Sequence, residues 1–149
     1  MTTHNTNIDV VAAAIVNNGR ILCVKRGKSK YDYTSFKYEF PGGKIEEGET
    51  QEEAIIREIS EELNIEIEVK KFLVSSTHSY PDFTITLHTF ICNILQGELT
   101  LNEHIEYKWL LPKELNSVIW TDADKEIVEL LTLCNYPYSA PHSQPLESL

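Results

Sequence analysis

Residues 43–65 read GKIEEGETQEEAIIREISEELNI and carry the clearest structural signals in the chain. Thr50 and Glu53 form a Thr-x-x-Glu capping box, which predicts a helix that begins directly after Thr50. Apolar residues recur at helical spacing inside it, and Asn64 stands where a residue in the left-handed conformation would end it. The sequence therefore predicts one amphipathic helix with defined ends.

Three glutamates gather on one face of this predicted helix. Glu58, Glu61 and Glu62 stand at positions i, i+3 and i+4, so their carboxylates share that face. Lysines at i+4 that would pair with them are missing, which weakens the alternative of an ordinary solvated acidic surface. Because oxygen-rich carboxylate clusters suit hard cations, we expect a site for Mg²⁺, or for Mn²⁺ in its place.

Two further features around the helix suit a phosphate site. Gly42 and Gly43 are expected to form a tight turn whose bare backbone approaches a phosphate or offers a carbonyl oxygen to a metal. Glu49 and Arg57 are expected to join the loop to the helix through charge-assisted hydrogen bonds. Their role would be positioning rather than bond-breaking.

Alternating and continuous apolar runs predict a sheet around this helix. We expect strands, in chain order, at residues 8–16, 20–24, 38–40, 65–75, 84–94 and 107–111. The polar, tyrosine-containing stretch 27–37 is expected to be a loop. Pro112 should open a short helix, and Asp122 is the expected N-cap of a last helix whose apolar side carries Ile127, Leu130, Leu131 and Cys134.

Length and composition predict one globular domain. The 149 residues are 42% apolar, which is enough for one core. We expect the domain to span residues 8–134, between a flexible amino-terminal segment, 1–7, and a mobile tail, 135–149. No apolar run approaches the roughly 20 residues of a membrane span, and the amino end lacks a signal-peptide pattern. We therefore expect a cytoplasmic protein with no membrane partner.

The net charge limits the possible partners, and the cysteines indicate which kinds of site the chain lacks. The formal net charge of −10 argues against polymeric nucleic acid, because coating a phosphate backbone requires many Lys and Arg side chains. Cys23, Cys92 and Cys134 are odd in number and lie far apart in apolar sequence. They are expected to be reduced core residues rather than a disulfide or metal framework.

Residues 43–65 resemble the Nudix box, and the segment 40–44, FPGGK, is similar to the one that leads into it in the MutT branch. The one departure is Asn64, where the family pattern has glycine, and both residues tolerate the left-handed cap. The resemblance implies an α/β (α+β) Nudix fold: an α/β/α sandwich with a curved mixed sheet and the box as a loop-helix-loop.

The resemblance also implies roles for the residues of the box. Glu58, Glu61 and Glu62 would hold the metal, with the Gly43 carbonyl as a further ligand. Water activated by the metal would attack a phosphorus within a nucleoside triphosphate, giving the monophosphate and pyrophosphate. This branch takes an extra base or metal ligand from a loop before the last sheet strand. Glu103 is assigned that role, with neighbouring Glu106 as the alternative.

Five residues are candidates for binding the substrate. Arg26 and Lys44 stand where MutT-like enzymes present cations to the phosphates, although either is also explained as a surface charge. Tyr38 and Phe40 are candidates for stacking on the base, with core packing as the alternative. Asp124 falls where these proteins place a base-reading side chain. Ionised, it would accept from the cytosine N4 amine, and protonated it would serve an oxidised guanine, while helix capping is the competing explanation.

The substrate remains a choice among hypotheses. The stretches 78–80 and 85–88, with His78 and His88, look like the corresponding hairpin of bacterial CTP pyrophosphohydrolases, which favours CTP, dCTP or modified cytidine triphosphates. The alternatives are an 8-oxo-dGTP diphosphatase, a hydrolase of nucleotide sugars or dinucleotides, and a domain that senses nucleotides without cleaving them. The three intact glutamates count against the last. The sequence leaves a monomer and a homodimer equally open.

Overall fold

The structure is a computed structural model that describes residues 6–133. The expected tail at 135–149, Cys134 and the first five residues lie outside the described part of the chain. Between residues 6 and 133, no helix combines the length and the apolar character that crossing a membrane requires.

Seven strands and two α-helices form the described chain. The strands are β1 (Thr6–Asn17), β2 (Arg20–Lys25), β3 (Tyr38–Glu39), β4 (Gly42–Lys44), β5 (Ile65–Ser79), β6 (Phe83–Gly97) and β7 (Glu106–Leu110). The helices are α1 (Gln51–Leu63) and α2 (Lys125–Leu133), with 3₁₀ turns η1 (Asp32–Thr34), η2 (Pro112–Ser117) and η3 (Asp122–Asp124). Each predicted strand and helix is therefore present, with shifted ends.

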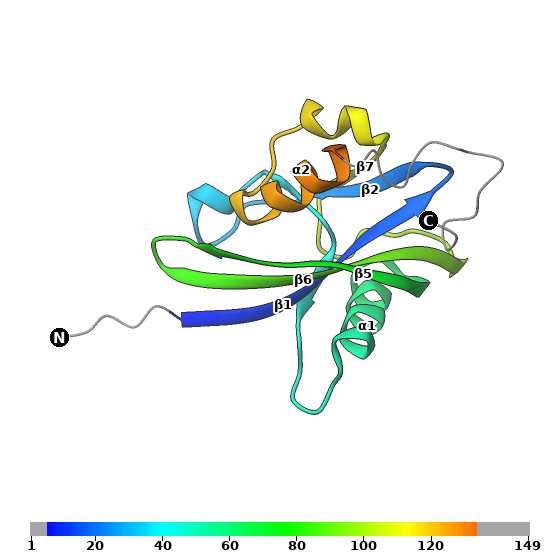
Figure 1. Cartoon of the computed structure of the whole chain (residues 1–149), viewed down its shortest axis with the longest axis horizontal. Helices are drawn as coiled ribbons and strands as arrows, with labels where there is room; N and C mark the ends of the chain where they lie inside the picture. The colour runs from blue at the N-terminus through cyan, green and yellow to red at the C-terminus, as the bar shows by residue number, and fades with distance from the viewer. Residues whose placement is uncertain (1–5, 134–149) are drawn as a thin grey trace.

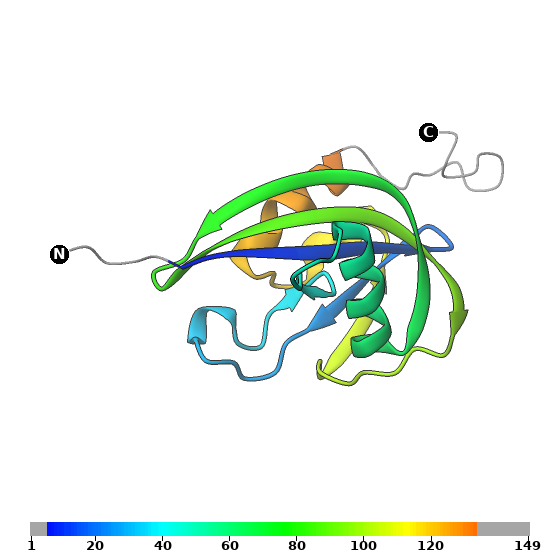
Figure 2. The same ribbon diagram turned by 90° about the horizontal axis from the view of Figure 1, so that it is seen from below.

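The sheet is mixed, as the resemblance implied. Its strands follow the order β3-β2-β1-β6-β5, while β4 pairs with β1 and β7 pairs with β2. β1 and β6 are parallel from the pair Thr6 and Phe83 to the pair Ile15 and Cys92, and the other pairings are antiparallel. Figure 2 shows β5 and β6 curving along their length.

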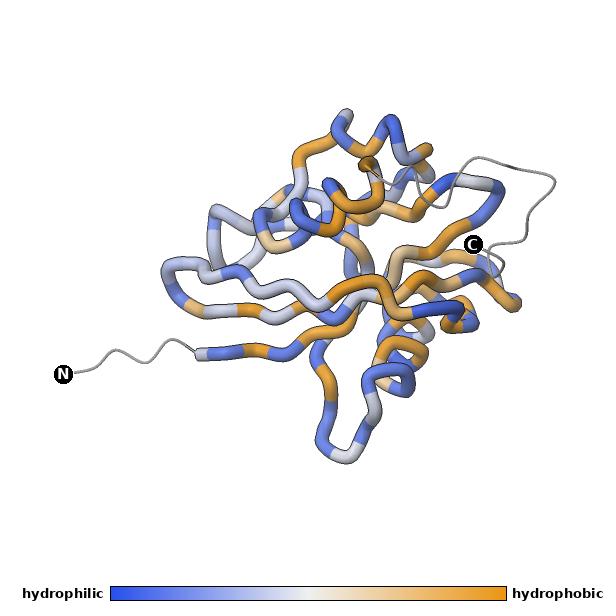
Figure 3. Tube along the Cα trace, viewed as in Figure 1, coloured by the Kyte–Doolittle hydropathy of each residue, from blue (hydrophilic) through white to orange (hydrophobic). Residues whose placement is uncertain are grey.

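Two apolar layers cover the faces of β1. Val11, Ala13 and Ile15 pack toward α1, in a cluster that includes Ile55 and Ile59. Ala12 and Ala14 belong to the opposite cluster, whose other members include Leu115, Trp120, Ile127 and Leu131. Figure 1 shows α1 on one side of the sheet and α2 on the other. Figure 3 shows hydrophobic residues along the strands of the sheet and within both helices. This arrangement confirms the α/β/α fold class and explains why β1 is apolar on both faces.

Both predicted ends of α1 are confirmed. The Thr50 side chain accepts from the Glu53 backbone at 3.1 Å, and the Glu53 carboxylate accepts from the Thr50 backbone at 3.0 Å. Asn64 adopts φ 61° and ψ 32°, the left-handed conformation expected of a residue that ends a helix. Local capping chemistry therefore fixes where the helix begins and ends.

The glycine pair differs from its prediction. Gly42 and Gly43 form strand β4, paired with Ala12 and Val11, instead of a tight turn. A Cβ at Gly42 would overlap the Val11 carbonyl oxygen and lie 2.8 Å from the Ala12 Cα. Glycine is required there because two backbones approach closely, not because of its freedom in φ.

Three other boundaries are corrected. β1 begins at Thr6, two residues before the predicted start, because Thr6 pairs with Phe83 of β6. β5 continues to Ser79, since its polar end pairs with the polar beginning of β6. Asp122 does not cap α2: it lies in η3 and its carboxylate pairs with Lys125 at 2.8 Å, and the helix begins only at Lys125.

The cysteine prediction holds for the two described thiols. Cys23 and Cys92 are free and fully buried. Burial raises the pKa of each thiol to about 12, because the thiolate would lose its hydration.

Candidate active site

Arg57, in the middle of α1, fastens the preceding loop to the helix. Its Nε and Nη2 donate to the two carboxylate oxygens of Glu49 at 2.5 and 2.9 Å, and Nη2 also donates to the Lys44 carbonyl oxygen at 3.1 Å. Its Nη1 donates to Glu58 at 3.0 Å and to Glu61 at 3.2 Å. The hydrogen bond from Arg57 lowers the pKa of Glu49 to about 2. The predicted pairing of Glu49 with Arg57 is confirmed.

Glu58, Glu61 and Glu62, called the helix acids below, differ in burial. The Glu61 side chain is 61% exposed and that of Glu58 is 15% exposed, while Glu62 is only 3% exposed. The Glu62 Oε1 atom is buried and has no hydrogen-bond partner among the described residues. Burial raises the pKa of Glu62, and contact with Glu58 and the charge of Glu103 raise it further. A cation is what would keep this carboxylate ionised.

The donor set around Glu62 fits a hard divalent cation, although its side chains are not gathered as ligands. Within residues 6–133, no three His, Cys, Asp or Glu side chains already form a metal-binding group. The Glu58 carboxylate lies against the backbone of Gly43, so closely that a Cβ there would stand 2.6 Å from its Oε2. Carboxylate oxygens and a bare backbone are thus adjacent, and such oxygen ligands are the ones that Mg²⁺ takes.

The two candidates for the extra acid point to different neighbours. Glu103 lies in the loop before β7, close enough to Glu62 for its charge to raise the pKa of that residue. Asn102 ties this loop to α1, because its backbone N–H donates to the Glu62 carbonyl oxygen at 2.9 Å. Glu106 instead accepts a hydrogen bond from the Tyr38 hydroxyl, which lowers the pKa of Glu106. The geometry favours Glu103 as the acid beside the helix.

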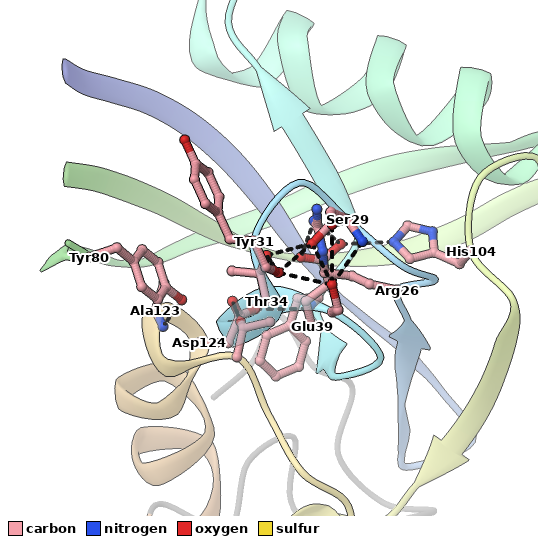
Figure 4. A network of polar contacts seen from close by, with 12 residues as sticks. Arg26, Ser29, Tyr31, Thr34, Glu39, Tyr80, His104, Ala123 and Asp124 are labelled. Atoms are coloured by element: carbon pink, nitrogen blue, oxygen red, sulfur yellow. Dashed lines mark hydrogen bonds and ion pairs between the residues drawn. The ribbon is translucent and has the colours of Figure 1, made fainter. Parts of the chain in front are cut away.

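Glu39 connects the two halves of the site, and the sequence analysis did not single it out. Its carboxylate accepts from Arg26 Nη1 at 3.2 and 3.3 Å and contacts His104 Nε2 at 2.9 Å, as Figure 4 shows. Its charge raises the pKa of both Glu62 and Asp124. The Arg26 Nε atom is buried and has no hydrogen-bond partner in the described part of the chain, so this guanidinium retains an unused donor.

A cavity of about 520 Å³ lies beside this network. Its volume is within the roughly 300–1,000 Å³ of typical small-molecule sites. The predicted residues that line it are Arg26, Phe40, Gly43, Lys44 and Asp124. The structure places Tyr38 in the core instead: it is 5% exposed, its ring packs near Trp120, and its hydroxyl is taken by Glu106. Tyr38 is therefore not positioned to stack on a base in this cavity.

Asp124 is fixed in the cavity wall. It is 4% exposed, and its two carboxylate oxygens accept from the Phe40 backbone N–H at 2.8 Å and the Thr121 hydroxyl at 2.7 Å. Burial raises the pKa of Asp124 and the charge of Glu39 raises it further, whereas the two hydrogen bonds oppose that rise. The bond to Thr121 spans η3, so Asp124 also stabilises the turn before α2.

The model of the NUDIX domain family matches residues 6–131, which is nearly all of the described chain. The chain belongs to the NUDIX family. Its loop-helix-loop from Gly43 to Ile65 is accordingly a Nudix box, with Asn64 serving as the left-handed cap.

Individual relatives place the chain in the MutT-like part of the Nudix family. It is 34% identical to the CTP pyrophosphohydrolase of Escherichia coli (strain K12) over 122 residues, which cover 82% of this chain and 89% of the relative. It is 30% identical to the 8-oxo-dGTP diphosphatase of the same strain over 123 residues, 81% of this chain and 94% of the relative. The solution structure of the E. coli ORF135 protein superposes with a TM-score of 0.75 at 31% identity, covering 91% of this chain and 96% of that one. The chain is therefore an enzyme, a Nudix pyrophosphohydrolase.

The Nudix cavity also contains residues that the sequence analysis missed. Tyr31, Tyr80 and Phe83 are among its lining residues, and Lys30 adds a third cationic residue to Arg26 and Lys44. The tyrosines of the 27–37 loop were visible in the sequence, but nothing local shows that this loop folds against the turn between β5 and β6.

Proposed function

We propose that this enzyme hydrolyses nucleoside triphosphates to the monophosphate and pyrophosphate with Mg²⁺, and that it prefers cytidine triphosphates. The observation that carries the proposal is one continuous cavity that reaches from Gly43, against the helix acid Glu58, to the buried base-reading candidate Asp124. An elongated substrate with an anionic end and a flat polar end fits such a cavity.

The helix acids Glu58, Glu61 and Glu62 would hold Mg²⁺, or Mn²⁺ in its place, with Glu103 and the Gly43 carbonyl oxygen as further ligands. When bound, the metal would neutralise phosphate charge and supply a water-derived nucleophile at neutral pH. What supports this assignment is the partnerless buried oxygen of Glu62 and the contact of Glu58 with the Gly43 backbone.

The residues around the metal position would orient the reactants. Arg57 holds Glu58 and Glu61 through Nη1, so the two carboxylates keep a fixed spacing. Arg26 and Lys44 line the cavity, where they would bind phosphate oxygens. Glu39 accepts from Arg26 Nη1, while the buried Nε has no hydrogen-bond partner among the described residues, so the guanidinium keeps donors for a phosphate.

Asp124 would select the base. Its oxygens accept hydrogen bonds from a backbone N–H and a hydroxyl, and these two bonds stabilise the ionised form against the rise in pKa that burial and the charge of Glu39 cause. An ionised carboxylate accepts only, which matches the N4 amine of cytosine. The similarity to the E. coli CTP pyrophosphohydrolase over 82% of this chain supports the same preference.

A second candidate substrate is 8-oxo-dGTP, and one observation favours it. Burial and the charge of Glu39 raise the pKa of Asp124, so a protonated Asp124 persists to higher pH than an exposed aspartate would. A protonated carboxyl donates a hydrogen bond, as recognition of an oxidised guanine would require. Similarity to 8-oxo-dGTP diphosphatases, including the E. coli enzyme, is in keeping with this candidate.

Pyrophosphate release with Mg²⁺ tests the proposal, measured as kcat/KM for CTP, dCTP, 5-methyl-dCTP, 8-oxo-dGTP and the ordinary triphosphates. The expected result is the highest kcat/KM for a cytidine nucleotide, with a value that rises with pH as Asp124 loses its proton. A preference for 8-oxo-dGTP that falls over the same pH range would select the second candidate. Absence of pyrophosphate from every nucleotide would refute both.

The variant Asp124→Asn separates the two candidates further, because the amide keeps the shape of the carboxyl group and adds donors. In the cytidine case it should lower kcat/KM for CTP far more than for 8-oxo-dGTP. Asp122→Asn is the matched control, since Asp122 pairs with Lys125 and does not line the cavity.

A further inference from the structure

Four aromatic side chains join two segments that lie far apart in the sequence. Tyr31 and Tyr33 come from the loop after β2, while Tyr80 lies in the turn after β5 and Phe83 is the first residue of β6. Neighbouring ring centroids are 5.1 Å apart for Tyr31 and Tyr33, 5.0 Å for Tyr33 and Tyr80, 5.6 Å for Tyr31 and Phe83, and 5.0 Å for Tyr80 and Phe83. We call these four residues the aromatic clasp.

Two hydrogen bonds hold the aromatic clasp in place. The Tyr33 hydroxyl donates to the Asp82 carboxylate at 2.7 Å, which links the loop directly to the turn. The Tyr80 hydroxyl accepts from the Ala123 backbone N–H at 2.9 Å, next to Asp124. Figure 4 shows Tyr80 reaching Ala123. The clasp is thus fixed both across its outer side and against the wall that carries the base-reading candidate.

The aromatic clasp lies at the opposite end of the cavity from the box glycine. Phe83 pairs with Thr6 of β1, whereas Gly43 pairs with Val11 of the same strand. Five residues of strand separate the two positions, or roughly 16 Å at about 3.3 Å per residue. Tyr31, Tyr80 and Phe83 all line the cavity at that far end.

Core packing alone does not explain the aromatic clasp. Tyr31, Tyr33 and Phe83 remain partly exposed, and Asp82 is exposed. Aromatic side chains that are held in place, partly exposed and part of a cavity lining are what nucleobases stack on. Phe40, the aromatic residue predicted for that role, is only 3% exposed and packs on Trp120, whereas Tyr31 and Phe83 keep part of their surface exposed.

We propose that the aromatic clasp is the nucleoside-binding wall of the cavity, with Tyr31 and Phe83 as stacking surfaces that the hydrogen bond between Tyr33 and Asp82 holds in position. The inference rests on the proposed nucleoside triphosphate substrate. It adds the residues that determine affinity for the nucleoside half, and it assigns them no part in phosphate binding or in the metal site.

The test separates the two halves of the substrate by measuring the binding of each product. Titration calorimetry with Mg²⁺ gives the dissociation constants of CMP and of pyrophosphate for the wild type, Tyr31→Ala and Tyr33→Phe. Tyr33→Phe removes only the hydroxyl that reaches Asp82 and keeps the ring. Tyr107→Phe is the matched control, because it makes the same change on an exposed tyrosine of β7 outside the cavity lining.

The expected result is selective loss of CMP binding. Tyr31→Ala should weaken CMP by about 5- to 150-fold, the range that loss of base stacking on an aromatic ring produces. Tyr33→Phe should weaken it by about two- to tenfold, as loss of one hydrogen bond does. Pyrophosphate binding and the Tyr107→Phe protein should be unchanged.

Unchanged CMP binding in Tyr31→Ala, or equal weakening of CMP and pyrophosphate, would overturn the proposal. If the wild type prefers a purine, the same titration is made with the corresponding monophosphate, so a wrong base leaves the clasp testable. A wild type that binds pyrophosphate but no nucleoside monophosphate would refute the clasp itself.

Discussion

Adding one methyl group at each of two adjacent glycines should have opposite consequences. In Gly42→Ala the new Cβ would overlap the Val11 carbonyl oxygen and lie 2.8 Å from the Ala12 Cα, which are backbone atoms of the central strand β1. In Gly43→Ala the three atoms nearest the new Cβ all belong to the end of the Glu58 side chain, including Oε2 at 2.6 Å. A carboxylate can swing aside cheaply, whereas a central strand cannot.

The expected sizes follow from these contacts. The Glu58 carboxylate must retreat by about 1.2 Å to reach ordinary contact, because Oε1 and Cδ lie closer to the new Cβ than Oε2 does. A misplacement of about 1 Å in a catalytic group costs on the order of 100-fold in rate, so Gly43→Ala should lose about that much kcat/KM with little loss of stability. Gly42→Ala should destabilise the fold by about 1–3 kcal/mol or more, as overpacking does.

The assay combines chemical denaturation with pyrophosphate release for both variants. Gly48→Ala is the control for replacing a glycine of the box, because its φ of +88° strains any side chain while nothing lies within 4 Å of the new Cβ. It should cost about 1 kcal/mol of stability and leave kcat/KM near that of the wild type. Full activity in Gly43→Ala, or a loss of stability equal to that of Gly42→Ala, would refute the reasoning.

Three other predictions concern ionisable side chains. Glu61→Gln should lower turnover by orders of magnitude while the denaturation midpoint stays within experimental error, because an exposed carboxylate loses its charge but not its shape; unchanged turnover would contradict its role. The pKa of Glu49 is lowered to about 2, so its pairing with Arg57 stabilises the fold above about pH 4.5 and this stabilisation is lost as the pH falls toward 2. Glu49→Gln should therefore flatten the acid part of a plot of Tm against pH. The pKa of Cys23 and of Cys92 is raised to about 12, so both thiols should react with a thiol reagent only after denaturation. Rapid labelling of either thiol in the native protein, located by mass spectrometry, would count against their burial.

Local signals allowed the box helix to be predicted from the sequence almost to the residue. Thr50, Glu53 and Asn64 act on backbone groups within four positions of themselves, so their effect does not depend on the rest of the fold. The pairing of Glu49 with Arg57 was predictable for the same reason, since both belong to one loop and one helix.

Contacts between distant segments could not be predicted in this way. Glu39 meets His104, 65 positions away, through the packing of β2 between β3 and β7, and no local pattern marks such a meeting. Gly42 and Gly43 look like a turn in isolation, and only the position of β1 makes them a strand. The alternation of residues 38–40 placed Tyr38 and Phe40 on one side of the strand but did not show that the Tyr38 hydroxyl would be taken by Glu106.

The parallel pairing of β1 with β6 has a consequence for how the chain folds. β1 is synthesised before the box, yet its parallel neighbour, residues 83–92, follows only after the whole box has been made. Until then the edge of β1 that pairs with β6 has no hydrogen-bonded neighbour. Bringing β1 and β6 together closes a loop that contains the whole box, which is slow relative to forming local hairpins. We expect refolding to begin with α1 and the hairpin of β5 and β6, with docking of β1 as the late step, so that Ala13→Gly in β1 would speed unfolding far more than it slows folding. Stopped-flow kinetics that showed the reverse would place β1 in the folding nucleus.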